Sequence, residues 1–275
     1  MKEKYRNYKL MSSLLAISLV FSCTVFEHCG FESTVSFGES EKFGVSEENV
    51  EKESKEGNLI YKYNASDKTA IVKKCNNSEV EKIEIPEYVQ KDGENYTVTI
   101  IGAKAFEGFV NLKFIKLPNS ITIIKWKAFE DCTKLKSIDL PCGLQRIETN
   151  AFCRCSSLQS IIVPQSVETL GRGVFKGCCD LKSAILLCNI NSLRNGTFAY
   201  CNNLKLVVLE YGLQKIKSEA FAFCLSLDTV VIQDSVTEIH SNAFEGCKNL
   251  KNAKVSMLTE VDYYAFPKHV EIERY

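Results

Sequence analysis

The segment AFCRC (151–155) places two cysteines one residue apart, which is a spacing that could serve metal binding or thiol chemistry. The two thiols belong to Cys153 and Cys155, on either side of Arg154. A metal site needs further ligands that converge on one point, and a reactive thiol needs a partner group close to it. Whether the pair is a chemical site therefore depends on the elements that carry it.

A repeat of 23 residues runs through most of the chain and includes this segment. Three series of residues keep this step, and a period of this length indicates a solenoid. The phenylalanines are Phe106, Phe129, Phe152, Phe175, Phe198, Phe221 and Phe244, followed after 22 residues by Phe266. The cysteines are Cys132, Cys155, Cys178, Cys201, Cys224 and Cys247, and the leucines are Leu112, Leu135, Leu158, Leu181, Leu204, Leu227 and Leu250.

Each repeat reads L-x-x-I-x-L-P-x-x-I-x-x-I-x-x-x-A-F-x-x-C, as in residues 112–132. The alternation at its start predicts a short strand with the apolar residues pointing inward. Pro118, Pro141 and Pro164 directly follow three of these strands and end them, because proline cannot donate a ladder hydrogen bond. The A-F-x-x-C segment then turns the chain back, with the phenylalanine beneath the coil.

These residues resemble the leucine-rich repeat, and more narrowly its BspA-like class, whose pattern is L-x-x-I-x-I-P-x-x-V-x-x-I-G-x-x-A-F-x-x-C. The repeat LQSIIVPQSVETLGRGVFKGC (158–178) matches it almost position by position, and the resemblance covers about 98–266. It implies a curved right-handed coil with a parallel sheet on its concave face, mostly β with short turns or 3-10 segments and little α-helix. Residues 181–201 depart from the pattern, since they lack the proline and carry Thr197 in place of alanine.

The repeat gives the cysteine pair a structural interpretation. Cys155 is one member of a ladder of thiols stacked along the coil axis, and cysteine is a frequent small buried residue. Cys153 lies out of phase with this ladder, as do Cys142, Cys179 and Cys188, so these four are expected on the surface. The pair is then a core thiol beside a surface thiol, and we expect no site there.

No other pattern in the chain predicts an enzyme, a metal site or a cofactor. The three histidines, His28, His240 and His269, have no ligand spacing, and the sequence contains no phosphate-binding glycine loop and no H-E-x-x-H motif. The formal net charge is zero, which disfavours nucleic acid as a partner. We therefore predict a binding protein without catalytic residues, metal or cofactor.

The N-terminal region has the features of an exported protein. Residues 1–22 carry basic residues and then an apolar run of signal-peptide length, which is too short to span a bilayer. Cys23 follows in a VFSC sequence and is a candidate for lipidation, which would be the only link to a membrane. We expect a disordered acidic linker at 23–57, an N-terminal β cap at 58–101, and leucine-rich repeats with a C-terminal cap at 102–275. The protein is predicted to be secreted or at the cell surface, where a eukaryotic host could glycosylate Asn64, Asn76, Asn95 and Asn195.

Apolar residues also occupy strand positions that should face outward, on the concave sheet. Contiguous exposed apolar side chains mark interaction sites, and repeat proteins bind on such faces. The alternative explanation is strand propensity alone, since isoleucine and valine favour strands. We call these residues the apolar stripe and predict that they bind a protein or extracellular-matrix ligand, as in the adhesion proposed for BspA-like proteins, or serve self-association in a structural surface module. The stripe comprises Ile162, Ile185, Leu206, Val208, Thr229 and Val231.

Overall fold

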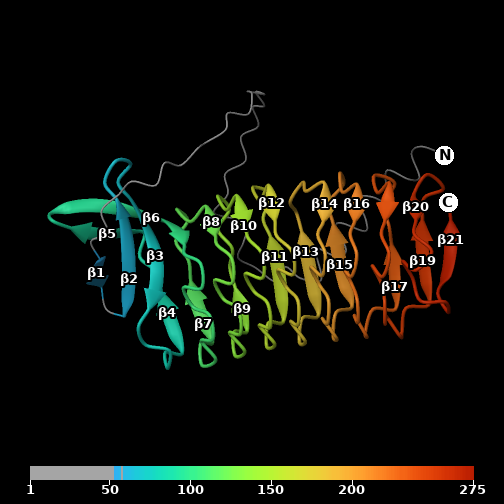
Figure 1. Cartoon of the computed structure of the whole chain (residues 1–275), viewed down its shortest axis with the longest axis horizontal. Helices are drawn as coiled ribbons and strands as arrows, with labels where there is room; N and C mark the ends of the chain where they lie inside the picture. The colour runs from blue at the N-terminus through green and yellow to red at the C-terminus, as the bar shows by residue number, and fades with distance from the viewer. Residues whose placement is uncertain (1–52, 57) are drawn as a thin grey trace, which may run out of the picture. The chain divides into compact units, whose positions relative to one another are not determined.

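Each repeat forms one coil of a solenoid, and the coils lie side by side along the long axis (Figure 1). The structure is a computed structural model, and it describes residues 53–56 and 58–275. All of the regular elements in these residues are strands, with no helix among them. The predicted leucine-rich repeat solenoid is therefore confirmed. The expected signal peptide, Cys23 and most of the expected linker lie outside the described residues.

The first strand of each repeat joins its neighbours in a parallel ladder that we call the front sheet (Figure 1). Its inward positions are the apolar residues that the L-x-x-I-x-L alternation predicts. Strand pairing is interrupted twice, which leaves three groups of three strands. They are β4 (Lys82–Glu84), β7 (Phe114–Lys116) and β9 (Ser137–Ile138); β11 (Ser160–Val163), β13 (Ser183–Leu186) and β15 (Leu206–Leu209); and β17 (Thr229–Val231), β19 (Asn252–Val255) and β21 (Glu271–Arg274).

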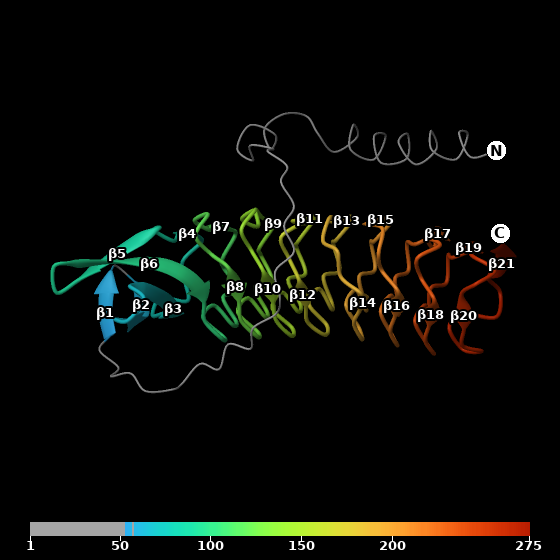
Figure 2. The same cartoon turned by 90° about the horizontal axis from the view of Figure 1, so that it is seen from above.

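A second parallel ladder, the back sheet, runs along the other side of the coils, and Figure 2 shows the two sides from above. Sequence analysis did not anticipate it, because each strand has only two residues. Each of them places one apolar residue inward, such as Ile147 in β10 and Leu193 in β14. Its pairing is interrupted once, between β12 and β14. The strands are β8 (Ile123–Ile124), β10 (Arg146–Ile147), β12 (Thr169–Leu170), β14 (Ser192–Leu193), β16 (Lys215–Ile216), β18 (Glu238–Ile239) and β20 (Glu260–Val261).

The N-terminal cap is continuous with both sheets. β1 (Glu53–Glu56), β2 (Leu59–Asn64) and β3 (Thr69–Cys75) form an antiparallel series. β5 (Tyr88–Lys91) and the long β6 (Glu94–Ile101) form a hairpin. β6 also pairs in parallel with β3 and β8, and β4 pairs in parallel with β7, so the boundary expected at residue 101 separates no folding units. β1 lies within the range 23–57 that is expected for the linker.

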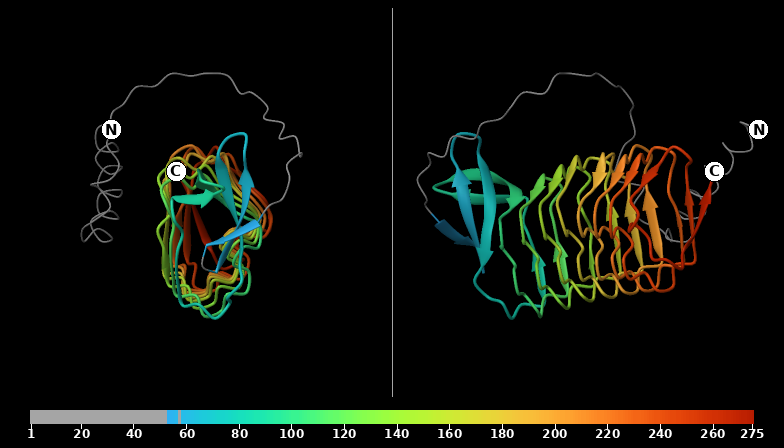
Figure 3. Two further views of the ribbon diagram at one scale, coloured as in Figure 1. Left: turned by 90° about the vertical axis from the view of Figure 1, so that its left-hand side faces the viewer. Right: turned by 45° about the vertical axis from the view of Figure 1, so that its right-hand side comes forward.

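Phenylalanine rings form a continuous stack through the interior of the coils, and the left view of Figure 3 shows the coils themselves end-on. From Phe106 to Phe266, neighbouring ring centroids lie between 4.5 and 5.8 Å apart, with interplanar angles from 4° to 14°. This separation is close to the strand spacing, so one ring per coil fills the interior without gaps. The rings from Phe106 to Phe244 are at most 1% exposed. Each ring is therefore buried only because a coil lies on both sides of it.

The turn after each phenylalanine also binds the coils to one another. The backbone N–H of Phe129 donates to the carbonyl of Ala151 in the next coil at 2.8 Å, and that of Phe198 donates to Ala220 at 2.8 Å. The second residue after each phenylalanine adopts a positive φ, which costs a residue other than glycine roughly 1–2 kcal/mol. Glycine occupies this position in three coils, at Gly108, Gly177 and Gly246. Asp131, Arg154, Tyr200 and Phe223 occupy it in the others.

Side-chain contacts offset this backbone cost in the coils without glycine. Arg154 donates to Asp131 of the preceding coil through Nε at 2.5 Å and Nη2 at 2.6 Å. Tyr200 and Phe223 stack with their ring centroids 4.9 Å apart and 6° between the planes. The residues with positive φ therefore interact in pairs across coils. Substitution of one member would remove the contact but leave the free-energy cost of the backbone conformation.

We predict that Phe198→Ala lowers the free energy of unfolding by about 3–5 kcal/mol, because it removes a buried ring that stacks on both Phe175 and Phe221. Urea unfolding followed by circular dichroism measures this change. The exposed Lys205 of the following coil provides the control, and Lys205→Ala should stay within about 0.5 kcal/mol of the parent. A Phe198→Ala protein with the parent's midpoint would contradict the stacking model.

Candidate binding surface

The ladder of repeat cysteines is buried and hydrogen-bonded. Each thiol donates to the carbonyl of the phenylalanine in the preceding coil, at 3.1–3.2 Å, and all six cysteines are 0% exposed. Burial raises the pKa of the Cys178 and Cys201 thiols well above the ordinary value, and that of Cys247 to about 12. A buried neutral thiol is a poor nucleophile and a poor metal ligand. The ladder is structural, as the sequence predicts, although it also contributes weak S–H···O bonds.

Two of the cysteines expected on the surface are buried instead. Cys153 is 2% exposed and Cys188 is 3% exposed, and burial raises the pKa of each thiol to about 11. Arg154 explains the first case, because its side chain passes over the turn and its Nη1 lies 3.7 Å from the Cys153 Sγ. Cys188 belongs to the hydrophobic core cluster. Cys142 is exposed and Cys179 is half-buried, as expected for these two.

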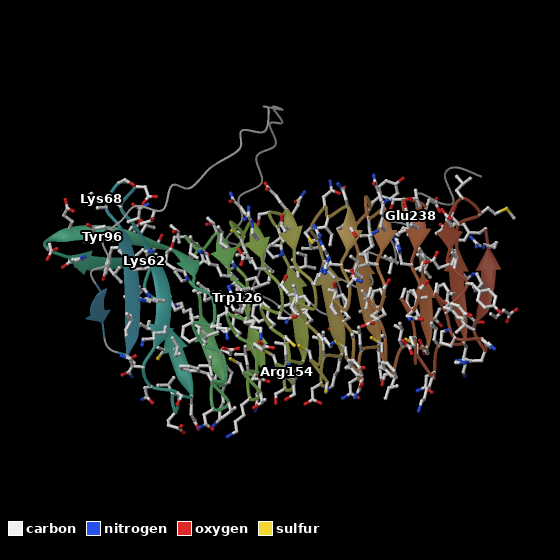
Figure 4. All side chains as sticks on the ribbon, in the orientation of Figure 1. Lys62, Lys68, Tyr96, Trp126, Arg154 and Glu238 are labelled. Carbon is white, nitrogen blue, oxygen red and sulfur yellow. The ribbon has the colours of Figure 1, made fainter. Side chains whose placement is uncertain are left out.

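The arginine of the C-R-C segment belongs to a charge network between coils (Figure 4). Its Nη2 lies 2.9 Å from the Glu130 carboxylate, which is 2% exposed and also pairs with Lys127 at 2.9 Å. Hydrogen bonds from Arg154 lower the pKa of the Asp131 carboxyl below its ordinary value. A carboxylate buried as deeply as Glu130 requires such partners, so the network stabilises the turns in this part of the coil. It is a structural network, because every charge in it has a partner.

The described residues contain no group of three or more histidine, cysteine, aspartate or glutamate side chains that could hold a metal ion. His240 lies 2.9 Å from the Lys217 Nζ, directly after β16, and 3.2 Å from the carboxylate of Glu238 in β18. Within residues 53–56 and 58–275, no helix has the length and apolar character that crossing a membrane requires. The outward faces of the coils are therefore the candidate surfaces for binding.

The front sheet brings the apolar stripe together on one face. Ile162, Ile185 and Val208 are in register on β11, β13 and β15, and Leu206 is in register with Ser183. On β17, Val231 is 61% exposed and Thr229 is exposed. Leu206 is 38% exposed, and Ile162 and Val208 are half-buried.

Ile185 differs from the expectation that all six residues of the stripe are exposed. It is only 5% exposed, because same-face neighbours flank it at strand spacing on both sides. Val208 has such a neighbour on one side only, since no pairing joins β15 to β17. The accessible part of the stripe therefore lies toward β15 and β17.

The interruption between β15 and β17 is a feature that sequence analysis missed. Three side chains that point inward near it, Val207, Leu209 and Val230, are only partly buried. The amide of Gln233 donates to the Leu209 carbonyl, where other coils have backbone ladder bonds. Tyr211, beside the interruption, is 59% exposed. Proline is absent after the strands of these coils, at Glu210 and Gln233, but it is also absent at Leu187, where β13 pairs with β15, so the repeat pattern does not mark this opening.

Comparison with known families and structures agrees with this architecture. A family model described as the BspA type leucine rich repeat region matches in six copies, over residues 69–205 and 175–275. The chain therefore belongs to the BspA type leucine rich repeat family. None of the curated proteins compared with the chain matches it.

Solved structures of leucine-rich repeat proteins are similar to the chain. The T. pallidum leucine rich repeat protein is 28% identical, with a TM-score of 0.53, over 79% of this chain and 92% of that one. A Eubacterium ventriosum leucine-rich repeat protein is 20% identical, with a TM-score of 0.53, over 79% of this chain and 51% of that one. A leucine rich cell surface protein from Faecalibacterium prausnitzii is 16% identical, with a TM-score of 0.42, over 82% of this chain and 94% of that one. The first two support the solenoid fold.

We predict that Cys142 is alkylated by iodoacetamide in the native protein at pH 8, whereas Cys153 and Cys188 are protected. A thiol with a pKa of about 11 has only about one part in a thousand of thiolate at that pH, and burial also blocks the reagent. Peptide mass spectrometry measures each site separately, and labelling in urea provides the control in which all three react. Equal alkylation rates for Cys153 and Cys142 in the native protein would show that Arg154 does not cover the Cys153 thiol.

Proposed function

We propose that this protein is an exported or cell-surface binding protein that contacts a protein or extracellular-matrix ligand through its front sheet, in adhesion or in protein–protein interaction. The observation that carries the proposal is the group of exposed apolar side chains beside the interruption, above all Leu206, Tyr211 and Val231. Soluble proteins rarely expose adjacent large apolar side chains without a binding role. The rigid stack behind them holds this surface in place before a ligand arrives, which reduces the entropy cost of binding.

The sequence of residues 1–23 supports export in the same proposal. Its basic start and apolar run have the pattern of a signal peptide, and Cys23 follows in a lipobox-like context. Lipidation there would hold the solenoid at a membrane surface. A surface position would expose the front sheet to matrix proteins and to neighbouring cells.

We predict that Val208→Glu combined with Val231→Glu reduces ligand capture at least about tenfold, because each carboxylate would lose its hydration in an apolar interface. Ile185 is left unchanged because it is 5% exposed, and a charge there would also disturb folding. The assay immobilises solubilised matrix proteins, identifies those retained by mass spectrometry, and measures each with the purified variants by biolayer interferometry.

The control for this experiment adds the same two charges to the same two coils, away from the front sheet. Gln214→Glu with Thr237→Glu meets this condition, because both side chains are exposed next to the back sheet. The control should bind like the parent, and both variants should keep the parent's melting temperature. Equal capture by the front-sheet variant and the parent would remove the front sheet as the binding surface.

Self-association of a structural surface module is the second candidate function, and the same exposed side chains favour it. Two copies could bury Leu206 and Val231 against each other in a two-fold interface. Multi-angle light scattering across a concentration series separates the candidates. A monomer at all concentrations supports the ligand-binding proposal, whereas a stable dimer that the Val208→Glu, Val231→Glu variant dissociates supports self-association.

A further inference from the structure

A hollow with an unusual combination of side chains lies on the back sheet and the turn that follows it, separate from the apolar stripe. Its volume is about 270 Å³, and four successive coils contribute to it. This is slightly less than the roughly 300–1,000 Å³ of sites for drug-sized molecules, so it suits one ring of a larger ligand. The lining residues are Trp126, Glu148, Thr149, Thr169, Gly171, Arg172 and Arg194.

Gly171 allows two coils to approach closely at the hollow. The equivalent positions of neighbouring coils carry Lys125, Glu148 and Arg194, whereas this coil has no side chain there. A Cβ on Gly171 would lie 2.3 Å from the backbone nitrogen of Thr149, so no other residue fits without a shift of the backbone. The backbone of these two coils therefore forms part of the lining of the hollow.

Two arginines give the hollow its affinity for an anion. The guanidinium groups of Arg172 and Arg194 are exposed, and neither forms an ion pair with another described residue. The single lining carboxylate, Glu148, already accepts a hydrogen bond from the backbone N–H of Trp126 at 2.9 Å. A guanidinium can bind a carboxylate or a sulfate through two parallel hydrogen bonds. This contrasts with Arg154, whose guanidinium is saturated by Glu130 and Asp131.

Trp126, the only tryptophan of the chain, forms a flat wall of the hollow and is 44% exposed (Figure 4). Two ammonium groups hold its ring, since the Lys104 Nζ lies 5.2 Å and the Lys127 Nζ 5.9 Å from the ring centroid. These lysines are also paired with Glu107 and Glu130, which hold the two ammonium groups in place beside the ring. An exposed, immobilised indole offers an apolar face and an N–H donor to a ligand.

We propose that this hollow binds an acidic sugar of a polysaccharide. The C–H face of a pyranose ring would stack on Trp126, its carboxylate or sulfate would pair with Arg172 and Arg194, and its hydroxyls would meet Thr149 and Thr169. A sugar fits this set better than a peptide, because the lining combines one aromatic ring with two threonines and two arginines in a space that suits one sugar ring. The site is independent of the front sheet, so this proposal does not rest on the proposed function.

The single tryptophan makes the test specific to the site, because excitation at 295 nm reports on Trp126 alone. The probes are hexasaccharides of heparin, which is sulfated, and of hyaluronan, which is carboxylated, with neutral maltohexaose and polyglutamate as comparisons. We expect a saturable change in tryptophan emission with one or both acidic saccharides and no change with maltohexaose. No response to either acidic saccharide, or an equal response to polyglutamate, would overturn the proposal.

Variants connect the response to the named side chains. Arg172→Gln with Arg194→Gln should weaken binding at least about tenfold, since a hydrogen bond to a charged group contributes roughly 1.5–3 kcal/mol. Calorimetry with Trp126→Ala should show a comparable loss. Lys182→Gln with Lys205→Gln removes two exposed cations from adjacent coils elsewhere and should leave binding unchanged. Unaltered affinity in the arginine variant, with an unchanged melting temperature, would refute the site.

Discussion

The burial of one phenylalanine ring per coil between two neighbouring rings is the constraint on which the rest of this structure depends. A ring such as Phe175 stacks on Phe152 and Phe198, which belong to the coils on either side of it. A coil therefore gains its hydrophobic stabilisation only by stacking, as in other repeat proteins. The stack also constrains where the repeat length can change: the last interval has 22 residues, yet Phe266 stacks on Phe244 and β20 pairs with β18.

This constraint explains why the most chemically suggestive residues are not reactive. The thiol of Cys155 lies on the inner side of the coil, where the stack excludes water, and it donates to the Phe129 carbonyl at 3.2 Å. The arginine next to it offsets a left-handed backbone and a buried glutamate. Groups with functional potential are therefore found at outward positions, where a coil can change its side chain without disturbing its neighbours.

Sequence reasoning succeeds for the inward positions and fails for some outward ones, for one physical reason. Inward burial follows from the period, so Phe129, Leu158 and Cys201 could all be assigned from spacing. Outward burial depends on which side chains stand one coil away, and a single repeat does not contain that information. Ile185 is covered by its neighbours in register, and Cys153 by Arg154, whose guanidinium pairs with Glu130 and Asp131 of the preceding coil. The opening between β15 and β17 likewise arises from how two coils pair, which spacing alone does not reveal.

The division between inward and outward positions also allows one stack to carry two independent surfaces. Exposed substitutions usually change stability by less than about 0.5 kcal/mol, whereas removal of a core ring costs several times more. The front sheet near Val231 and the hollow near Trp126 are connected only through that core. A rigid core holds both surfaces in place, but it has no second conformation through which binding at one surface would change the affinity of the other. Ligands on the two faces should therefore bind without cooperativity. The family fold does not determine either ligand, because specificity resides in outward side chains that the stack does not constrain.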